Sequence, residues 1–124
     1  MNPIQDIAIV LPAFNEEQDL PKLLARIQET LSEQPFRYQV IVVDDGSKDR
    51  TAEIAREAAT RMPLTLIQHG VNRGLGMAMQ TGLRAAALAA DAVITMDSDN
   101  SHDPANIPAM VKVLESGAAN LVIA

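Results

Sequence analysis

Five short apolar runs alternate with amphipathic stretches along this chain, and this alternation limits its fold more than any other feature. The runs occupy residues 7–12, 40–43, 64–67, 92–96 and 120–123. Most of them are apolar at every position rather than at every second one, which is typical of strands covered on both faces. The alternation therefore predicts a mostly parallel β-sheet with helices packed on both sides of it.

The first two amphipathic stretches each predict a helix. In the first, apolar residues recur at helical spacing over 20–31, with Asp19 as a candidate N-cap and Pro21 tolerated in the first turn. The second helix is predicted to follow Ser47 or Asp49, either of which could cap it. Its apolar residues are Ile54, Ala55, Ala58, Ala59 and Met62.

Two further helices are predicted after the third and fourth strands. Residues 75–90 are rich in alanine, and residues 105–116 are followed by Gly117, a typical residue just beyond a helix end. The predicted order is therefore a regular alternation of strands and helices. This order is typical of a three-layer α/β/α fold, Rossmann-like in its arrangement, in which ligands bind beyond the carboxyl ends of the strands.

The composition agrees with one globular domain of 124 residues, because 48% of the residues are hydrophobic and 21% are charged. With a formal net charge of −6, the chain lacks the clustered cations that binding to nucleic acid requires, so no nucleic acid is expected as a partner. The absence of cysteine excludes disulfides and thiolate metal sites. No signal peptide is recognisable, and no stretch approaches the roughly 18 apolar residues of a membrane span. We therefore expect a cytoplasmic protein.

Polar residues gather directly after the first four predicted strands. The segments are PAFNEE after the first strand, DDGSKDRT after the second, HGVNRGLG after the third and DSDNSHDP after the fourth. Because the carboxyl ends of parallel strands lie at one edge of a sheet, these four segments are expected to meet there. Their gathering indicates a ligand site more strongly than any one of the segments does.

The segment DSDNSHDP carries the densest set of candidate metal ligands. Asp97 and Asp99 are two residues apart, about 6.6 Å in an extended chain, so both carboxylates can address one ion. Carboxylate oxygens suit hard cations such as Mg²⁺ or Mn²⁺. A calcium loop is excluded, because His102 and Pro108 stand where its glycine and glutamate are required. Zinc is a poor fit, because cysteine is absent and His69 is the only other histidine.

The other three segments each allow a structural and a functional interpretation. DDGSKD fits either a capped turn or a carboxylate that binds a nucleobase or ribose. NRGLGMAMQTG, residues 72–82, fits either a tight entry into a helix or a backbone close to a ligand, with Arg73 facing its phosphates. Its glycine spacing differs from that of the dinucleotide-binding fingerprint. PAFNEE fits either a plain turn before a helix or part of a site.

Taken in order, four segments of the chain resemble the N-terminal half of glycosyltransferase family 2. They are LPAFNEE, VIVVDDGSKDRT, NRGLGMAMQTG and VITMDSDNSHDP, and together they extend over essentially the whole chain. The family has the GT-A fold, and the chain most resembles its dolichyl-phosphate and polyprenyl-phosphate sugar synthases. The resemblance implies an inverting glycosyltransferase that moves a sugar from GDP-mannose or a UDP-sugar to an acceptor, either a lipid phosphate such as polyprenyl phosphate or a glycan.

The resemblance also implies a role for each matched position. The residues implied to bind the nucleotide sugar are Pro12, Ala13, Phe14, Asn15, Glu16, Asp44, Arg73, Gly74, Gly76, Asp97, Ser98 and Asp99. Among these, Asp44 matches the carboxylate that reads the nucleobase. Asp97 and Asp99 match the D-x-D pair that holds Mg²⁺ or Mn²⁺ and are the implied catalytic residues, with Ser101 as a further candidate ligand. Asn100 and Ser101 depart from the Leu-Gln or Leu-Ser pair that the sugar synthases often carry.

The implied mechanism is a single displacement at the anomeric carbon of the sugar. A metal between the two aspartates and the diphosphate would neutralise the charge that builds up on the leaving nucleotide. The same ion would explain how a chain with a net negative charge binds an anionic donor.

Two other folds fit the chain less well, and a third function stays open. A receiver domain would carry its acidic pair after the first strand, whereas VVDD follows the second. A phosphatase of the haloacid dehalogenase type would carry its D-x-D motif after the first core strand, not the fourth. The alternative that remains is a nucleotide-sugar-binding domain without turnover.

The chain ends inside the fifth predicted strand, where members of the family continue into an acceptor half. We therefore expect residues 1–124 to be a truncated glycosyltransferase domain that lacks the general base and the acceptor site. Association with the cytoplasmic face of a membrane would come from regions outside this chain, and the sequence leaves the oligomeric state open.

Overall fold

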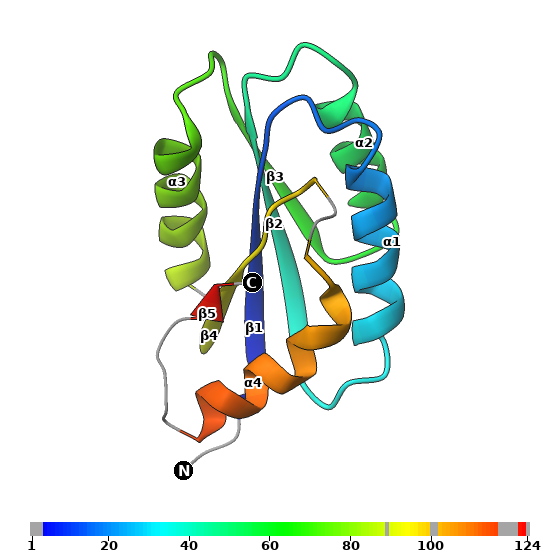
Figure 1. Ribbon diagram of the computed structural model, residues 1–124, viewed down its shortest axis with the longest axis vertical. Coiled ribbons are helices and arrows are strands. Elements are labelled where there is room, and N and C mark those ends of the chain that lie inside the picture. The colour runs from blue at the N-terminus through cyan, green and yellow to red at the C-terminus, as the bar shows by residue number, and fades with distance from the viewer. Residues whose placement is uncertain (1–3, 89, 100–101, 117–121, 124) are drawn as a thin grey trace.

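A strand is present at each of the five predicted apolar runs, and all five lie in one sheet (Figure 1). The structure is a computed structural model that describes residues 4–88, 90–99, 102–116 and 122–123. The strands are β1 (Asp6–Ala13), β2 (Arg37–Asp45), β3 (Leu64–His69), β4 (Ala92–Thr95) and β5 (Val122–Ile123). Their order across the sheet is β3-β2-β1-β4-β5, and every neighbouring pair is parallel. The predicted parallel sheet is therefore confirmed; residues 120 and 121 of the last run lie outside the described residues.

The helices agree with the predicted ones in position and differ at their ends. They are α1 (Leu20–Leu31), α2 (Thr51–Ala58), α3 (Leu75–Ala87) and α4 (Ile107–Glu115), with the 3₁₀ turn η1 (Pro104–Asn106) before α4. The prediction for α2 was too long, because Met62 lies beyond its end. Met62 precedes Pro63, and the residue before a proline avoids the helical conformation. The predicted last residues of the other helices differ by at most a few positions, and Gly117 lies outside the described residues.

The predicted side-chain caps are not confirmed, because the N-cap of α2 is Arg50 and neither α1 nor α2 has a capping hydrogen bond from its N-cap side chain. Asp49 accepts a hydrogen bond from the backbone amide of Thr51 at 3.0 Å, the first residue of α2. Asp19 stands at the N-cap position of α1, but its side chain makes no capping hydrogen bond. The Ser47 hydroxyl does not cap α2; it accepts a hydrogen bond from the backbone amide of Asn15.

Helices cover both faces of the sheet, so the predicted three-layer α/β/α arrangement is confirmed (Figure 1). Successive residues of β1 point to opposite faces of the sheet. Ile9 packs into the core beneath α1, α2 and α4, whereas Val10 packs against α3. The residues that α3 buries against the sheet are all small, namely Ala78, Gly82 and Ala86. There, a β-carbon added to Gly82 would lie 2.3 Å from Cγ1 of Val10, so glycine at this position lets the helix approach the sheet.

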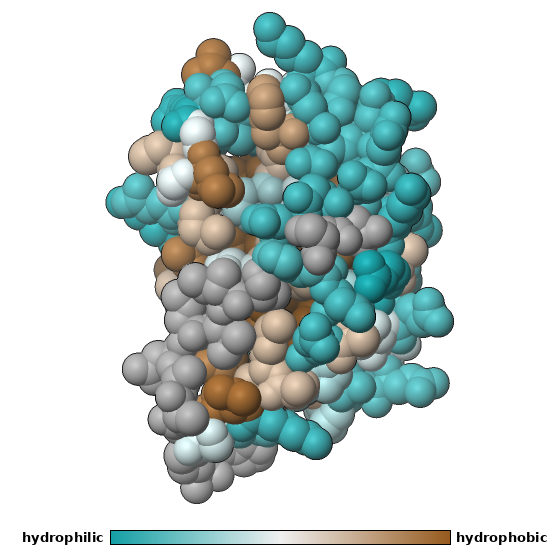
Figure 2. Space-filling view, in the orientation of Figure 1, coloured by the Kyte–Doolittle hydropathy of each residue, from teal (hydrophilic) through white to brown (hydrophobic). Residues whose placement is uncertain are grey.

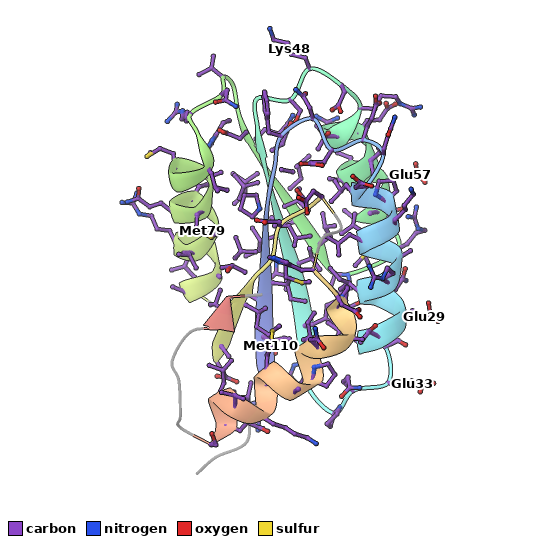
Figure 3. All side chains as sticks on the ribbon, viewed as in Figure 1. Glu29, Glu33, Lys48, Glu57, Met79 and Met110 are labelled. Atoms are coloured by element: carbon purple, nitrogen blue, oxygen red, sulfur yellow. The ribbon has the colours of Figure 1, made fainter. Side chains whose placement is uncertain are left out.

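The two helical layers also differ at the surface. On the side of α1 and α2, Glu29, Glu33 and Glu57 point away from the sheet (Figure 3). On the face that Figure 2 shows, apolar side chains lie mainly over α3 and its preceding loop, with a further group over α4. Large exposed apolar residues at α3 and its preceding loop are Val71, Leu75, Met77 and Leu88. No helix in the described ranges combines the length and apolar character needed to cross a bilayer.

The strand order creates a switch point beside β1. From β1 the chain moves outward to β2 and β3, then returns to place β4 on the other side of β1. The connections after β1 and β4 therefore leave in opposite directions, and the crevice between them is where parallel α/β sheets bind ligands. We name the segments after β1 to β4 the first loop (14–19), second loop (46–50), third loop (70–74) and fourth loop (96–99).

Candidate functional site

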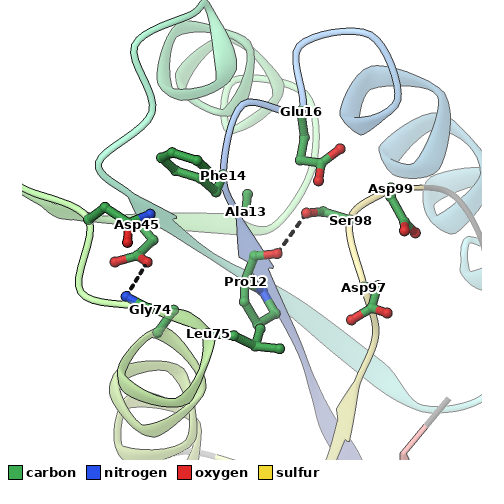
Figure 4. A pocket seen from close by; sticks show the side chains of 12 residues that line it. Pro12, Ala13, Phe14, Glu16, Asp45, Gly74, Leu75, Asp97, Ser98 and Asp99 are labelled. Carbon is green, nitrogen blue, oxygen red and sulfur yellow. Dashed lines mark hydrogen bonds between the residues drawn. The ribbon is translucent and has the colours of Figure 1, made fainter.

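A pocket of about 260 Å³ opens at this switch point, at the carboxyl end of the sheet. The last residues of β1 form its floor, between the start of α3 on one side and the fourth loop on the other (Figure 4). Its lining residues come from all four strand ends, as the sequence predicts. They are Pro12, Ala13, Phe14, Glu16, Asp45, Asn72, Gly74, Leu75, Ala78, Asp97, Ser98 and Asp99.

Most of the predicted donor-binding residues lie together in this pocket. Those that line it are Pro12, Ala13, Phe14, Glu16, Gly74, Asp97, Ser98 and Asp99. Asn15, Arg73 and Gly76 are exposed nearby but are not among the lining residues. Ser101, the further candidate metal ligand, lies outside the described residues, as does Asn100.

The structure places Asp45, not Asp44, in this pocket. Successive residues of a strand point to opposite faces, and Asp45 follows the register of Ile41 and Val43, which pack against α3. Asp44 lines a second, wider pocket of about 750 Å³ on the other side of Phe14, and it accepts a hydrogen bond from the amide of Ser47 at 3.1 Å. Sequence reasoning missed Asp45, although the alternation along β2 was a usable signal.

Three carboxylates face the pocket from the side of the first and fourth loops, namely Glu16, Asp97 and Asp99 (Figure 4). Burial raises the pKa of Glu16 above its usual value, and the negative charges of Asp99, Asp19, Asp49 and Asp97 raise it further. The carboxylates on this wall therefore repel one another's negative charge. Such a wall favours a bound cation.

The carboxylates of this pocket suit a magnesium or manganese ion that takes its remaining ligands from phosphates and water, rather than an ion coordinated by protein side chains alone. Among the described residues, no group of three or more histidine, aspartate or glutamate side chains is arranged to hold a metal. Asp97 and Asp99 therefore offer two carboxylates at most, which is the usual protein share for Mg²⁺, since phosphates and water supply its other ligands. The side chain of Asp97 is 52% exposed, which leaves it accessible to such a ligand.

His102 is a neighbour of this pair rather than part of a zinc site. Its Nδ1 lies 3.3 Å from the backbone nitrogen of Asp97, which donates to it, and its Nε2 lies 3.9 Å from Oδ2 of the same residue. His102 does not line the pocket, and these contacts help to orient Asp97.

The fourth loop is fastened to β1 by a buried hydrogen bond. The hydroxyl of Ser98 donates to the backbone carbonyl of Pro12 at 2.6 Å, and only 2% of Ser98 is exposed (Figure 4). Ser98 was predicted to bind the donor, but its hydroxyl points inward to β1. Because this residue lies between Asp97 and Asp99, the bond holds both aspartates beside the pocket.

The first loop is fastened to the second in the same manner. The amide of Asn15 donates to the Ser47 hydroxyl at 2.8 Å, and the amide of Lys48 donates to the side-chain oxygen of Asn15 at 3.0 Å. The amide of Glu16 donates to the hydroxyl of Thr51 at 2.8 Å. The side chain of Asn15 thus serves a structural contact, and it holds Glu16 and Phe14 at the edge of the pocket.

The third loop is held by Asp45. The carboxylate accepts hydrogen bonds from the backbone amides of Arg73 at 2.9 Å and Gly74 at 2.8 Å. Burial raises the pKa of Asp45, but hydrogen bonds from His69 and from these two amides outweigh it, and the pKa lies below its usual value. Asp45 is therefore ionised at neutral pH. Polar contacts thus hold each of the four loops, either to another loop or to the end of a neighbouring strand.

Known proteins resemble this chain in both sequence and structure. An undecaprenyl-phosphate 4-deoxy-4-formamido-L-arabinose transferase from Pseudomonas savastanoi pv. phaseolicola is 37% identical over 93% of the chain, which covers 34% of that protein. A dolichol-phosphate mannosyltransferase from Pyrococcus furiosus is 33% identical over 90% of the chain, which covers 31% of that protein. The chain thus spans about a third of the length of these relatives.

A solved mannosyltransferase from Pyrobaculum calidifontis, in complex with GDP-Man and Mn²⁺, has the same fold. It superimposes with a TM-score of 0.69 at 29% identity, over 79% of this chain and 28% of its own. The sequence profile of the family described as "Glycosyl transferase family 2" matches residues 8–124. The predicted resemblance is confirmed: the chain belongs to glycosyl transferase family 2.

Proposed function

We propose that this chain forms the donor-binding part of a glycosyltransferase, in which Asp97 and Asp99 bind a nucleoside diphosphate sugar through a divalent metal ion. The family supports sugar transfer as the activity. The observation that carries the proposal is the position of the two aspartates. They stand at the wall of the pocket at the switch point, beside Glu16, whose pKa is raised in part by the negative charges of both aspartates.

The pocket offers different surroundings for the two ends of such a donor. On the side of the fourth loop, Asp97 and Asp99 would hold Mg²⁺ or Mn²⁺, which supplies Lewis-acid stabilisation of the leaving diphosphate when bound. On the other side, the ring of Phe14, which is 44% exposed, lies between the two pockets and offers a flat apolar surface to a nucleobase. The base, guanine or uracil, would then reach toward Asp44 in the wider pocket.

The acceptor is proposed from the relatives. The two relatives are named for undecaprenyl phosphate and dolichol phosphate, so we propose a polyprenyl phosphate as the acceptor class. A lipid acceptor places the reaction at a membrane surface, and we propose the cytoplasmic face.

Nucleotide binding by the purified protein tests this proposal. We expect calorimetry to show binding of GDP or UDP in the presence of Mn²⁺ and much weaker binding in EDTA. In Asp99→Ala, the metal-dependent affinity should fall by at least about 100-fold, because a metal ligand is lost. The comparison of GDP with UDP identifies the base.

Glu57→Ala is a matched control, because it removes the same charge from an exposed site on α2, where the Glu57 side chain is 71% exposed. It should leave the affinity unchanged. Equal binding with and without Mn²⁺, or equal affinities of the wild type and Asp99→Ala, would rule out the proposed metal-dependent donor site.

A further inference from the structure

A buried histidine stands between the two pockets: it lines the wider one and contacts Asp45, which lines the narrower one. Nδ1 of His69, at the end of β3, lies 2.7 Å from Oδ1 of Asp45, at the end of β2. Their side chains are only 8% and 4% exposed. Because the pKa of Asp45 is lowered and its carboxylate is ionised, the Nδ1 atom carries the proton of this hydrogen bond.

The histidine ring is fixed at its other nitrogen as well. Nε2 lies 2.9 Å from the hydroxyl of Thr81, in the second turn of α3. The ring therefore bridges the end of the sheet and the helix whose first turn forms one side of the pocket. Contacts at both nitrogens leave the ring a single orientation, and this orientation aims Nδ1 at Asp45.

The carboxylate of Asp45 passes this restraint on to the third loop. Oδ1 accepts from His69 and from the amide of Arg73. Oδ2 accepts from the amide of Gly74, the bond that Figure 4 draws. Gly74 has φ +97 and is the N-cap of α3, so the direction in which the loop enters the helix is set at this residue. Gly74 and Leu75 line the pocket, so the position of this wall depends on how the carboxylate is oriented.

The same bond controls where the charge of Asp45 is directed. Every oxygen of this carboxylate is engaged by a donor on the protein, which draws its negative charge toward the loop and the histidine. A carboxylate released from His69 could turn toward the pocket, where its negative charge, added to those of Glu16, Asp97 and Asp99, would repel a diphosphate. His69 therefore affects both the position of the third loop and the direction in which the charge of Asp45 points.

We infer that His69 is a positioning residue of the nucleotide pocket, which acts through Asp45 to fix the third loop, since both of its ring nitrogens are already engaged by Asp45 and Thr81. The inference rests on the proposed donor site for its effect on affinity. Its effect on the loop is independent of any ligand.

Two substitutions of His69 distinguish the roles of its two ring nitrogens. In His69→Asn, the side-chain amide nitrogen can take the place of Nδ1 and donate to Asp45, whereas in His69→Gln it reaches toward the place of Nε2. We expect His69→Gln to weaken Mn²⁺-dependent binding of GDP or UDP by about tenfold, as for the loss of a charge-assisted hydrogen bond. His69→Asn should bind within about threefold of the wild type, because that bond is kept.

Hydrogen exchange of the Arg73 and Gly74 amides is the second measurement. By NMR, both should exchange faster in His69→Gln than in the wild type or in His69→Asn. Thr81→Val leaves Asp45 and His69 in place, so it should accelerate exchange of the two amides less than His69→Gln does. It is the variant to measure if His69→Gln does not fold. Val111→Ala, a core truncation on α4, controls for lost stability and should leave the nucleotide affinity unchanged.

The outcomes separate the inference from the proposed function. Wild-type affinity in His69→Gln, unchanged exchange of the two amides, or an equal loss of affinity in Val111→Ala would overturn the role of His69. If the wild type binds neither GDP nor UDP with Mn²⁺, the proposed function fails. The amide exchange then decides alone whether His69 holds the third loop.

Discussion

Polar contacts hold both ends of the parallel sheet, and the ion pair Arg37–Asp6 at the amino end is exposed, whereas two contacts at the carboxyl end are buried. At the amino end, Arg37 and Asp6 form a bidentate pair with distances of 2.7 and 2.9 Å, and their side chains are 75% and 36% exposed. At the carboxyl end, Asp45 pairs with His69 and Ser98 bonds to Pro12 with almost no exposure to solvent. Buried hydrogen bonds are costly to break, whereas exposed ion pairs contribute little.

The backbone shows the same contrast. In the described ranges, the residues with positive φ are Asn15, Gly46 and Gly74, and all three lie in loops at the carboxyl end. Such conformations persist only where the surrounding structure holds them. The difference indicates that the carboxyl end maintains one fixed shape, as a binding pocket requires, while the amino end only needs to be closed.

The largest test of this contrast is Gly46→Ala, in the second loop. Gly46 has φ +78, and an added β-carbon would lie 2.5 Å from the backbone nitrogen of Asn72 and 2.6 Å from the carbonyl carbon of Val71. The substitution combines backbone strain with a clash against the third loop. We expect the free energy of unfolding to fall by about 3 kcal/mol in urea denaturation.

Gly70→Ala is the matched control in the third loop. No atom lies within 4 Å of its added β-carbon, and no positive φ is required there. Its stability should stay within about 0.5 kcal/mol of the wild type. Equal stabilities of the two variants would show that the second and third loops are not packed rigidly.

Ser98→Ala is expected to have the next largest effect. It leaves the carbonyl of Pro12 without its buried partner, so the free energy of unfolding should fall by about 1–2 kcal/mol. Mn²⁺-dependent nucleotide affinity should fall too, because Asp97 and Asp99 lose their anchor to β1. In the control Ser32→Ala, an exposed hydroxyl loses its 3.2 Å bond to the carbonyl of Glu29, and neither quantity should change measurably.

A smaller effect is expected on the pH dependence of stability, because the pKa values of Asp45 and Glu16, both at the carboxyl end, are shifted in opposite directions. The pKa of Asp45 is lowered in the folded chain, so its contribution to stability is present above the ordinary aspartate pKa of about 3.9 and is lost as the pH falls below it. The pKa of Glu16 is raised, so its ionisation opposes folding as the pH rises through its titration. NMR titration of the side-chain carboxyl carbons should place Glu16 above Asp45; the reverse order would contradict the arrangement.

The smallest effect is expected from Arg37→Ala at the amino end. The pair with Asp6 is exposed to solvent, and salt screens such a pair. The change in stability should be smaller than in Ser98→Ala, and the nucleotide affinity should not change. A loss of affinity in this variant would show that the two ends of the sheet are coupled.

The fold could be predicted because most of the strands contain a run that is apolar at every position, and the helices repeat their apolar residues at helical spacing. The pocket followed from the fold, since parallel strand ends meet at one edge, and Asp97 and Asp99 lie there as expected. The contacts between the loops could not be predicted. Ser98 and Pro12 are 86 residues apart in sequence, and no local pattern indicates that a hydroxyl will reach a particular carbonyl.

The choice between Asp44 and Asp45 shows a different limit. Both residues end the same strand, and their positions relative to the pocket differ only because side chains alternate along β2. Family resemblance favoured Asp44, whereas the register of Ile41 and Val43 directs Asp45 toward α3. The role of His69 depends on three elements packed together, so it could be recognised only in the folded structure.

The pocket takes its lining from residues as far apart in the chain as Pro12 and Asp99. No contiguous stretch contains it, so during synthesis it is completed only after β4 has docked beside β1. A ligand of this pocket therefore binds only the assembled sheet and shifts the folding equilibrium as a whole, by about 2.7 kcal/mol at a concentration 100 times its Kd. Occupancy of the pocket can therefore be measured as a rise in the Tm of the whole domain when nucleotide and metal are added.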